Sequence, residues 1–267
     1  MQLSSTYTSY TQINKDLTKS LARTAKQADV QRDTDYYNKH IGDIKSIDDF
    51  MKNDRIYRFA MKAYGLEDMI FAKAMIRKVL EGGVTDKDSY ANKLNDPRFK
   101  ELAKAFDFKA LGAATTNTEA AQKKTVDAFL RQKLESNAGE ENEGVRLALY
   151  FQRKAASVTS PYGILADKAL LKVYQTAYDV SPLTSSQSIE TQAATVKKML
   201  DIKDLQDPKK VEKIIQKFTA KFDVNNGGVA GAQSPTMQLW QNLNNDSPVS
   251  IGPDIYNSLF NLKLGGR

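Results

Sequence analysis

The stretch DRIYRFAMKAYGLEDMIFAKAMIRKVLEGGVTDKDSYANKLNDPRFKELAKAFDF (residues 54–108) decides the fold, because its apolar residues recur every three or four positions. Asp54 and the pair Asp96-Pro97 are typical helix starts, since a carboxylate accepts bonds from the free first-turn amides and proline lacks an amide there. Gly65 and Gly82-Gly83 are typical helix ends. The stretch predicts four linked helices, near residues 54–63, 67–80, 85–94 and 96–106.

The same periodicity continues outside this stretch, and no alternating pattern typical of a strand interrupts it. Predicted helices follow near residues 119–136, 145–156, 161–178 and 208–224. We therefore expect an all-α, multi-helical globular protein of about ten helices. Hydrophobic residues make up 41% of the 267 residues, which is enough for a packed core.

Four sequence segments within these predicted helices carry a family resemblance. They are AMKAYGLEDMIFAKAMIRKVLEGG, ANKLNDPRFKELAKAFDF, NEGVRLALYFQRKA and ILADKALLKVYQTAY. Over roughly residues 30–224 the chain resembles the alphaproteobacterial family catalogued as domain of unknown function 1217. The resemblance implies a bacterial protein linked to motility, because members tend to be associated with flagellar gene neighbourhoods. It implies no activity, since none is established for the family.

A fainter copy of the central stretch recurs about a hundred residues later. KALLKVYQTAYDV matches RIYRFAMKAYGL, and QDPKKVEKIIQKFTAKFDV matches NDPRFKELAKAFDF. The matches indicate two related helical units, although caps and aromatic core positions also recur by chance in helical proteins. We expect an N-terminal amphipathic segment over residues 1–45, helical units over 46–116 and 117–224, and a flexible C-terminal segment over 225–267.

Both ends of the chain combine polar sequence with apolar residues at helical spacing. We expect residues 1–12 to be disordered and an amphipathic helix of about five turns to follow. One hypothesis is that this helix and the C-terminal segment bind a partner or each other. The alternative is that the helix packs on its own domain. The candidate partner-binding residues are Tyr10, Ile13, Leu17, Leu21, Ile255, Leu259 and Leu262.

Positive charge is spread thinly along the chain. The net charge of +7 comes from 39 basic and 32 acidic residues, and no predicted segment has more than three basic residues in excess. A basic stripe follows one face of the last predicted helix, and its members are Lys210, Lys213, Lys217 and Lys221. Such a stripe can neutralise phosphates. It is more often the solvated face of an amphipathic helix, so we do not favour a nucleic-acid partner.

The sequence offers little for catalysis or cofactor binding. It has no cysteine, and His40 is its only histidine, which argues against zinc sites and cysteine nucleophiles. We interpret His40 as a packing or surface residue. No phosphate-binding loop or EF-hand spacing is present. We therefore predict a non-enzymatic protein without catalytic, metal or cofactor-binding residues.

These observations favour a flagellum-associated protein, an exported accessory or assembly factor acting through protein–protein contacts. The absence of cysteine suits export into an oxidising space. The sequence shows no apolar run long enough to span a membrane and no apolar leader at residues 1–12, so we expect export without a cleaved signal peptide. The alternative is a cytoplasmic helical adaptor or chaperone, and nucleic-acid binding ranks third. The pattern does not define an oligomeric state.

Overall fold

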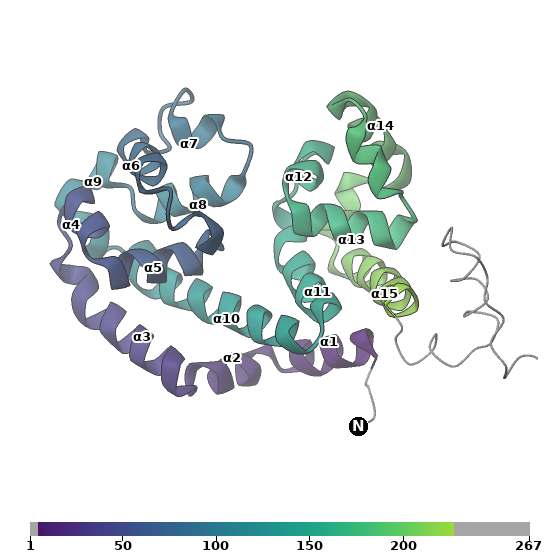
Figure 1. Cartoon of the computed structure of the whole chain (residues 1–267), viewed down its shortest axis with the longest axis horizontal. Helices are drawn as coiled ribbons and strands as arrows, with labels where there is room; N and C mark the ends of the chain where they lie inside the picture. The colour runs from purple at the N-terminus through teal and green to yellow at the C-terminus, as the bar shows by residue number, and fades with distance from the viewer. Residues whose placement is uncertain (1–4, 227–267) are drawn as a thin grey trace, which may run out of the picture.

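The computed structural model describes residues 5–226, and this part of the chain consists of helices and connecting turns with no strand (Figure 1). The prediction of an all-α fold is confirmed. Eleven of the α-helices have seven or more residues, close to the ten expected. The α-helices are α1 (Thr6–Lys15), α2 (Leu17–Ala25), α3 (Ala28–His40), α4 (Ile47–Lys52), α5 (Asp54–Ala63), α6 (Lys73–Gly82), α7 (Tyr90–Lys93), α8 (Pro97–Ala105), α9 (Phe108–Leu111), α10 (Thr125–Glu141), α11 (Glu143–Lys154), α12 (Pro161–Ala166), α13 (Lys168–Tyr178), α14 (Ile189–Met199) and α15 (Pro208–Asn225).

Short 3₁₀ or π turns join these helices. They are η1 (Ile41–Asp43), η2 (Glu67–Met69), η3 (Gly112–Asn117), η4 (Ala120–Lys124), η5 (Ala155–Ser157), η6 (Pro182–Ser186) and η7 (Ile202–Gln206). The π turn η4 runs directly into α10. None of the helices within residues 5–226 is both long enough and apolar enough to cross a lipid bilayer.

The helices form two lobes, each with its own hydrophobic cluster (Figure 1). The first lobe comprises α3–α9 and the first half of α10. Its centre is a stack of three rings, in which Phe59 lies 4.2 Å from Tyr37 and 4.0 Å from Phe129 between ring centroids. The stack joins α3, α5 and α10, and offset aromatic pairs add to the gain from burial.

The second lobe comprises α1 and α11–α15. Its largest fully buried side chains are Tyr10, Phe151, Tyr174 and Phe218, which come from α1, α11, α13 and α15. The first helix of the chain therefore packs with the last described helix. Each fully buried ring contributes roughly 2–3 kcal/mol relative to an exposed one, so this packing holds α1 against the lobe.

Helix α10 connects the lobes. It packs against α5 of the first lobe and α11 of the second, and α2 lies along it. At 17 residues it spans about 25 Å. Figure 1 shows α10 and the α1–α2 segment running together beneath the two lobes, whose other helices rise on either side. This arrangement separates the upper parts of the lobes.

The central stretch folds as predicted in two of its four helices. Helix α5 ends before Gly65, which has a φ of 69°, and α8 begins at Pro97 with Asp96 accepting the Arg98 amide. The predicted helix near 67–80 is wrong: it is split into η2 and α6, and Phe71, which lies between them, is 81% exposed to solvent. The predicted helix near 85–94 shrinks to the four residues of α7.

The start of the chain also differs from expectation. Helix α1 begins at Thr6, within the segment predicted to be disordered, and the backbone amide of Thr6 donates to Asp223 Oδ2 of α15 at 3.0 Å. The predicted five-turn helix is broken at Asp16, whose side chain accepts the Lys19 amide at 3.0 Å. A short acidic side chain competes with the helix for such amides, which explains the break.

The two clusters divide the chain differently from the predicted ranges. The first cluster takes Val30 and Tyr37 from the predicted N-terminal segment and Phe129 from the predicted second unit. The second takes Tyr10 from the predicted N-terminal segment. Residues 227–267, which include nearly all of the predicted C-terminal segment, lie outside the described residues.

The predicted repeat has local counterparts in the structure. Both α5 and α13 are followed by a residue with a positive φ, Gly65 and Asp179 respectively. In both cases the amide of the next residue donates to the carbonyl five positions earlier, from Leu66 to Met61 and from Val180 to Gln175. Their packing differs, because α13 lies chiefly against α15 whereas α5 lies chiefly against α10. A common origin of the two units stays a prediction.

Candidate protein-binding cleft between the lobes

A cleft of about 830 Å³ separates the upper parts of the lobes. Its first-lobe wall comes from the loop after α5 and from the start of α8, and its second-lobe wall from α11, α13 and the end of α15. A second hollow of about 750 Å³ continues along α10 and shares several lining residues with the cleft. The shared residues are Gly65, Asp68, Arg98, Gln132 and Arg146.

Arg98 organises the first-lobe wall. Its guanidinium donates to the carbonyl of Gly65 at the end of α5 and, from Nη2, to Asp96 Oδ2 at 2.7 Å. Burial is the largest single influence on the pKa of Arg98 and lowers it, but the hydrogen bonds to Asp96 and the negative charges of Asp96 and Asp68 together outweigh burial and raise this pKa above the ordinary value. Arg98 therefore stays charged and ties the loop after α5 to the start of α8.

Tyr150 and Asp167 organise the second-lobe wall. The Tyr150 hydroxyl on α11 donates to Asp167 Oδ2 at 2.5 Å, while the other oxygen of Asp167 caps α13 by accepting the Ala169 amide at 2.9 Å. Burial and the nearby carboxylate raise the pKa of Tyr150 above its ordinary value. The phenol therefore stays protonated and serves as a hydrogen-bond donor.

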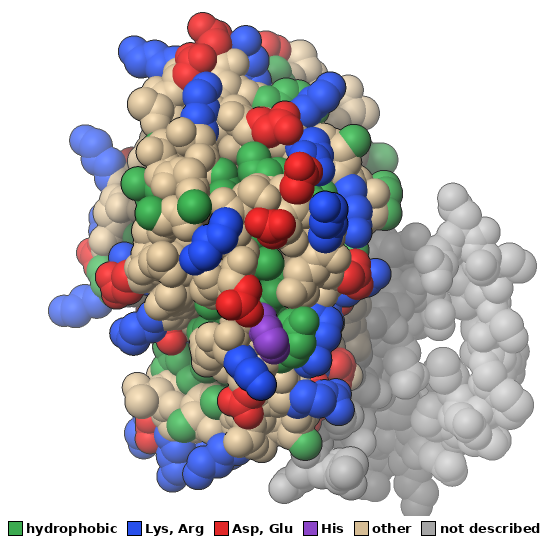
Figure 2. Space-filling view, turned by 90° about the vertical axis from the view of Figure 1, so that its left-hand side faces the viewer, with side chains coloured by type: hydrophobic (Ala, Val, Ile, Leu, Met, Phe, Trp, Pro, Cys, Tyr) green, Lys and Arg blue, Asp and Glu red, His purple; other side chains and the backbone are tan. Residues whose placement is uncertain are grey.

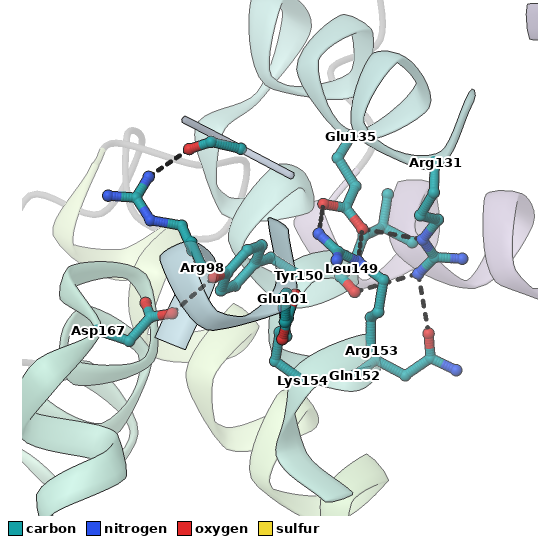
Figure 3. A network of polar contacts seen from close by, with 11 residues as sticks. Arg98, Glu101, Arg131, Glu135, Leu149, Tyr150, Gln152, Arg153, Lys154 and Asp167 are labelled. Atoms are coloured by element: carbon teal, nitrogen blue, oxygen red, sulfur yellow. Dashed lines mark hydrogen bonds and ion pairs between the residues drawn. The ribbon is translucent and has the colours of Figure 1, made fainter. Parts of the chain in front are cut away.

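A buried ionic network lies where α10 meets α11 (Figure 3). Glu135 is 2% exposed, and its Oε1 accepts from Nε of both Arg131 and Arg153 at 2.8 Å. Arg131 also donates to the Leu149 carbonyl and to Gln152, each at 3.1 Å. These bonds fix the angle between α10 and α11, and hence the position of the second lobe at the base of the cleft.

An ion pair joins the lobes directly. Lys154 Nζ of α11 lies 2.5 Å from Oε1 and 2.7 Å from Oε2 of Glu101 in α8 (Figure 3). The Lys154 side chain is only 12% exposed, so water screens this pair less than it screens a surface pair. The contact holds α8, which carries Arg98, against α11, which carries Tyr150.

The charges that line the cleft balance. Four basic and four acidic residues face it, and Arg98 and Arg146 are each bonded to a neighbouring carboxylate. A lining with paired charges gives no net attraction for a phosphate or a metal ion. The acidic members are Asp68, Asp96, Glu143 and Asp167, and the basic members are Arg98, Arg146, Lys168 and Lys172.

The predicted partner-binding face lies largely against its own molecule. Tyr10 is fully buried and donates to Glu212 Oε2 at 3.0 Å, and Ile13 packs against the second cluster. Leu17 and Leu21 lie half-buried on α2, which runs along α10. In this structure Tyr10 is therefore not available to a partner. Its burial agrees with the alternative, in which this helix packs on its own domain. The predicted residues Ile255, Leu259 and Leu262 lie outside the described residues.

The predicted basic stripe lies on α15, as expected, and much of it is engaged within the molecule. Lys210 Nζ is 2.6 Å from Asp204 Oδ1, and Lys217 lies 5.6 Å from the Tyr178 ring centroid. Lys221 pairs with Asp179 and donates to the Ala177 carbonyl at the end of α13 at 3.1 Å. Lys213 is exposed. These contacts dilute the positive field that nucleic acid would require.

His40 lies outside the cleft, at the end of α3. Its Nδ1 is 3.2 Å from Asp43 Oδ2, and its ring centroid is 4.4 Å from that of Tyr36. On the face in Figure 2, lysine and arginine alternate with aspartate and glutamate, and no large patch of one sign forms there. Across residues 5–226, no group of three His, Cys, Asp or Glu side chains is placed to hold a metal ion.

The residues of the cleft carry no common signal in the sequence. The sequence marks Asp96 as a helix cap, but nothing in it marks Arg98, Tyr150 or Asp167 as neighbours, since they are separated by up to 69 positions along the chain. The capping position Asp96 is the only local signal, and caps occur at many helix starts. The helix predicted over 161–178 runs through Asp167, whereas in the structure Asp167 ends α12 and caps α13. The cleft depends on the angle between α10 and α11, which the buried network sets.

Comparisons with known proteins place the chain in a family. The model of the family described as "Protein of unknown function (DUF1217)" matches residues 63–211. Protein AGR_C_984 from Agrobacterium tumefaciens, whose X-ray crystal structure is known, has 50% sequence identity to this chain. The two structures superpose with a TM-score of 0.78. The match covers 85% of this chain and 98% of that one. A comparison with curated proteins gives no match. With more than half of its length matched by the family model, the chain belongs to the DUF1217 family of proteins of unknown function.

Proposed function

We propose that this protein is a non-enzymatic, flagellum-associated protein that acts through protein–protein contacts, and that the cleft between the lobes receives the partner. The observation that carries the proposal is the cleft itself, to which both lobes contribute. The cleft of about 830 Å³ adjoins the hollow of about 750 Å³ along α10, so that the two form one extended surface. A segment of another protein fits a surface of this length.

The chemistry of the lining supports a protein ligand. The cleft is lined by paired arginines and carboxylates, by the Tyr150 ring and by the apolar side chains of Leu147 and Phe222. Arginine and tyrosine are frequent anchors in protein interfaces because they combine apolar area with hydrogen-bond donors. The cleft offers both kinds of contact to one bound segment.

The flagellar part of the proposal comes from the family resemblance and needs a test in cells. Cells are fractionated into cytoplasm, sheared flagella and medium, in one strain with working flagellar export and one without. Protein found outside the cell only when export works supports an exported flagellar component. Protein confined to the cytoplasm in both strains favours the alternative, a cytoplasmic helical adaptor or chaperone.

The role of the cleft is tested with a matched pair of variants. Ala166 is exposed and lines the cleft, whereas Ala194 is exposed on α14 and does not. Ala166→Arg places a long side chain in the cleft, and Ala194→Arg adds the same side chain elsewhere. We expect the first variant to impair swimming motility and the second to preserve it. Equal motility of both variants and the unchanged protein would contradict the proposal.

A further inference from the structure

We propose that the cleft of the free protein is occupied by this chain's own residues 234–245, SPTMQLWQNLNN, with Trp240 as the anchor. The inference rests on the proposed use of the cleft as a protein-binding surface and names the segment that binds there first. A partner then has to displace this segment before it can bind.

The described part of the chain ends at the cleft. Phe222 and Asn226, at the end of α15, are themselves lining residues of the cleft. The chain therefore continues into residues 227–267 from the rim of the cleft. Trp240 follows Asn226 by fourteen residues, a reach of up to about 50 Å when extended, so every part of the cleft is within range.

The charges of the cleft lining favour a neutral ligand. The four basic and four acidic residues of the lining cancel, and the guanidiniums of Arg98 and Arg146 already have carboxylate partners. A ligand that binds either guanidinium through a negative charge would have to break these pairs, whereas a neutral ligand leaves them intact. Residues 234–245 contain no charged side chain and are rich in amides and hydroxyls that donate and accept hydrogen bonds.

The side chain of Trp240 is chemically suited to the lining of the cleft. Trp240 is the only tryptophan of the chain, and Met237, Leu239 and Leu243 are its apolar neighbours. A tryptophan ring binds well over a guanidinium, and Arg98 and Arg146 both lie where the cleft meets the hollow along α10. Leu147, Ala169 and Phe222 supply apolar surface for the rest of the segment.

The single tryptophan makes the proposal measurable in the full chain. Acrylamide quenching of Trp240 fluorescence is compared with that of a free peptide of residues 234–245. We expect the quenching constant of the full chain to be several-fold lower than that of the peptide. Ala166→Arg should raise it towards the peptide value, and Ala194→Arg should leave it unchanged. A full-chain constant equal to that of the peptide, or one that Ala166→Arg does not alter, overturns the proposal.

Cross-linking identifies the occupant independently, because the natural chain has no cysteine. Ala166→Cys is combined with Leu239→Cys, and Ala194→Cys with Leu239→Cys, and each pair is treated with a short bis-maleimide. We expect an intramolecular cross-link in the first pair only, seen by mass spectrometry of the monomer. A cross-linked dimer would assign the cleft to a second copy of the chain and overturn the proposal, as would equal cross-linking of both pairs.

The outcomes separate this inference from the proposed function. If Trp240 is freely quenched while Ala166→Arg still impairs motility, the cleft binds a partner and the chain's own segment does not occupy it. If Trp240 is protected in the cleft and Ala166→Arg leaves motility unchanged, the segment binds there and the proposed function fails.

Discussion

Lys154 of the second lobe and Glu101 of the first form an ion pair of 2.5 Å that bridges the base of the cleft. The two partners differ in environment, since the Lys154 side chain is 12% exposed and that of Glu101 is 39% exposed. Loss of Glu101 therefore leaves a nearly buried ammonium group, whereas loss of Lys154 leaves a solvated carboxylate.

The asymmetry of this pair gives the first prediction. Glu101→Gln leaves the nearly buried ammonium of Lys154 without its counter-charge, and we expect a loss of about 1–3 kcal/mol in the free energy of unfolding. Lys154→Met leaves only a solvated carboxylate, and the loss should stay below about 1 kcal/mol. Urea denaturation of both variants measures the difference. An equal loss in both would show that Lys154 gains little from its partner.

Glu135 is the centre of the buried network, and its replacement should be costly. Glu135→Gln removes the charge that Arg131 and Arg153 share, and we expect about 3–5 kcal/mol of destabilisation in urea. The control is Glu67→Gln, whose side chain is 69% exposed and whose Lys62 pair is worth about 1 kcal/mol or less. Similar midpoints for the two variants would refute the structural role of the network.

Gly144 marks the point where three helices of the second lobe meet. A Cβ added to Gly144 would lie 2.6 Å from Phe222 Cδ1 and 2.8 Å from Thr6 Cγ2. Gly144→Ala should therefore lower stability by about 1–3 kcal/mol and speed hydrogen exchange in α1. Gly42→Ala is the matched control, because a Cβ there meets nothing within 4 Å. Unchanged exchange in α1 after Gly144→Ala would show that this junction does not hold the helix.

The buried tyrosines predict an alkaline limit to stability. Burial raises the pKa of Tyr57 to about 12 and the pKa of Tyr10 and Tyr37 further. Since the folded state favours the neutral phenol, this stabilisation is complete below pH 10 and is lost as pH rises from 10 towards 12. Denaturant midpoints across this range, with tyrosinate absorbance at 295 nm, measure it. Stability that is flat to pH 12 would contradict the burial of these hydroxyls.

The fold class followed from sequence because the signals involved are local. Apolar spacing, the Asp96-Pro97 start and the Gly65 end act within one helix, and each was found where expected. The break at Asp16 and the turn at Phe71 were missed for a related reason. A helical spacing of apolar residues persists across a break when the two pieces pack on the same core.

The site could not be predicted, because it depends on distant segments meeting. Tyr10 looked like a partner-binding residue from its spacing, but its hydroxyl finds Glu212 some 202 positions later. Tyr10 is buried because α1 packs between α11 and α15, and the local sequence does not encode that contact. Arg98 and Tyr150 likewise line one cleft only because the Glu135 network sets the angle between α10 and α11.

The central claim is that the cleft between the lobes binds a flagellar protein, and site-specific photo-cross-linking in cells tests it most directly. A photoreactive amino acid is placed at position 166 in the cleft or at position 194 outside it, in strains with and without flagella. The account predicts an adduct with a flagellar protein, identified by mass spectrometry, from position 166 in flagellated cells only. The absence of a flagellar adduct at position 166, or the same adducts from both positions, would contradict it.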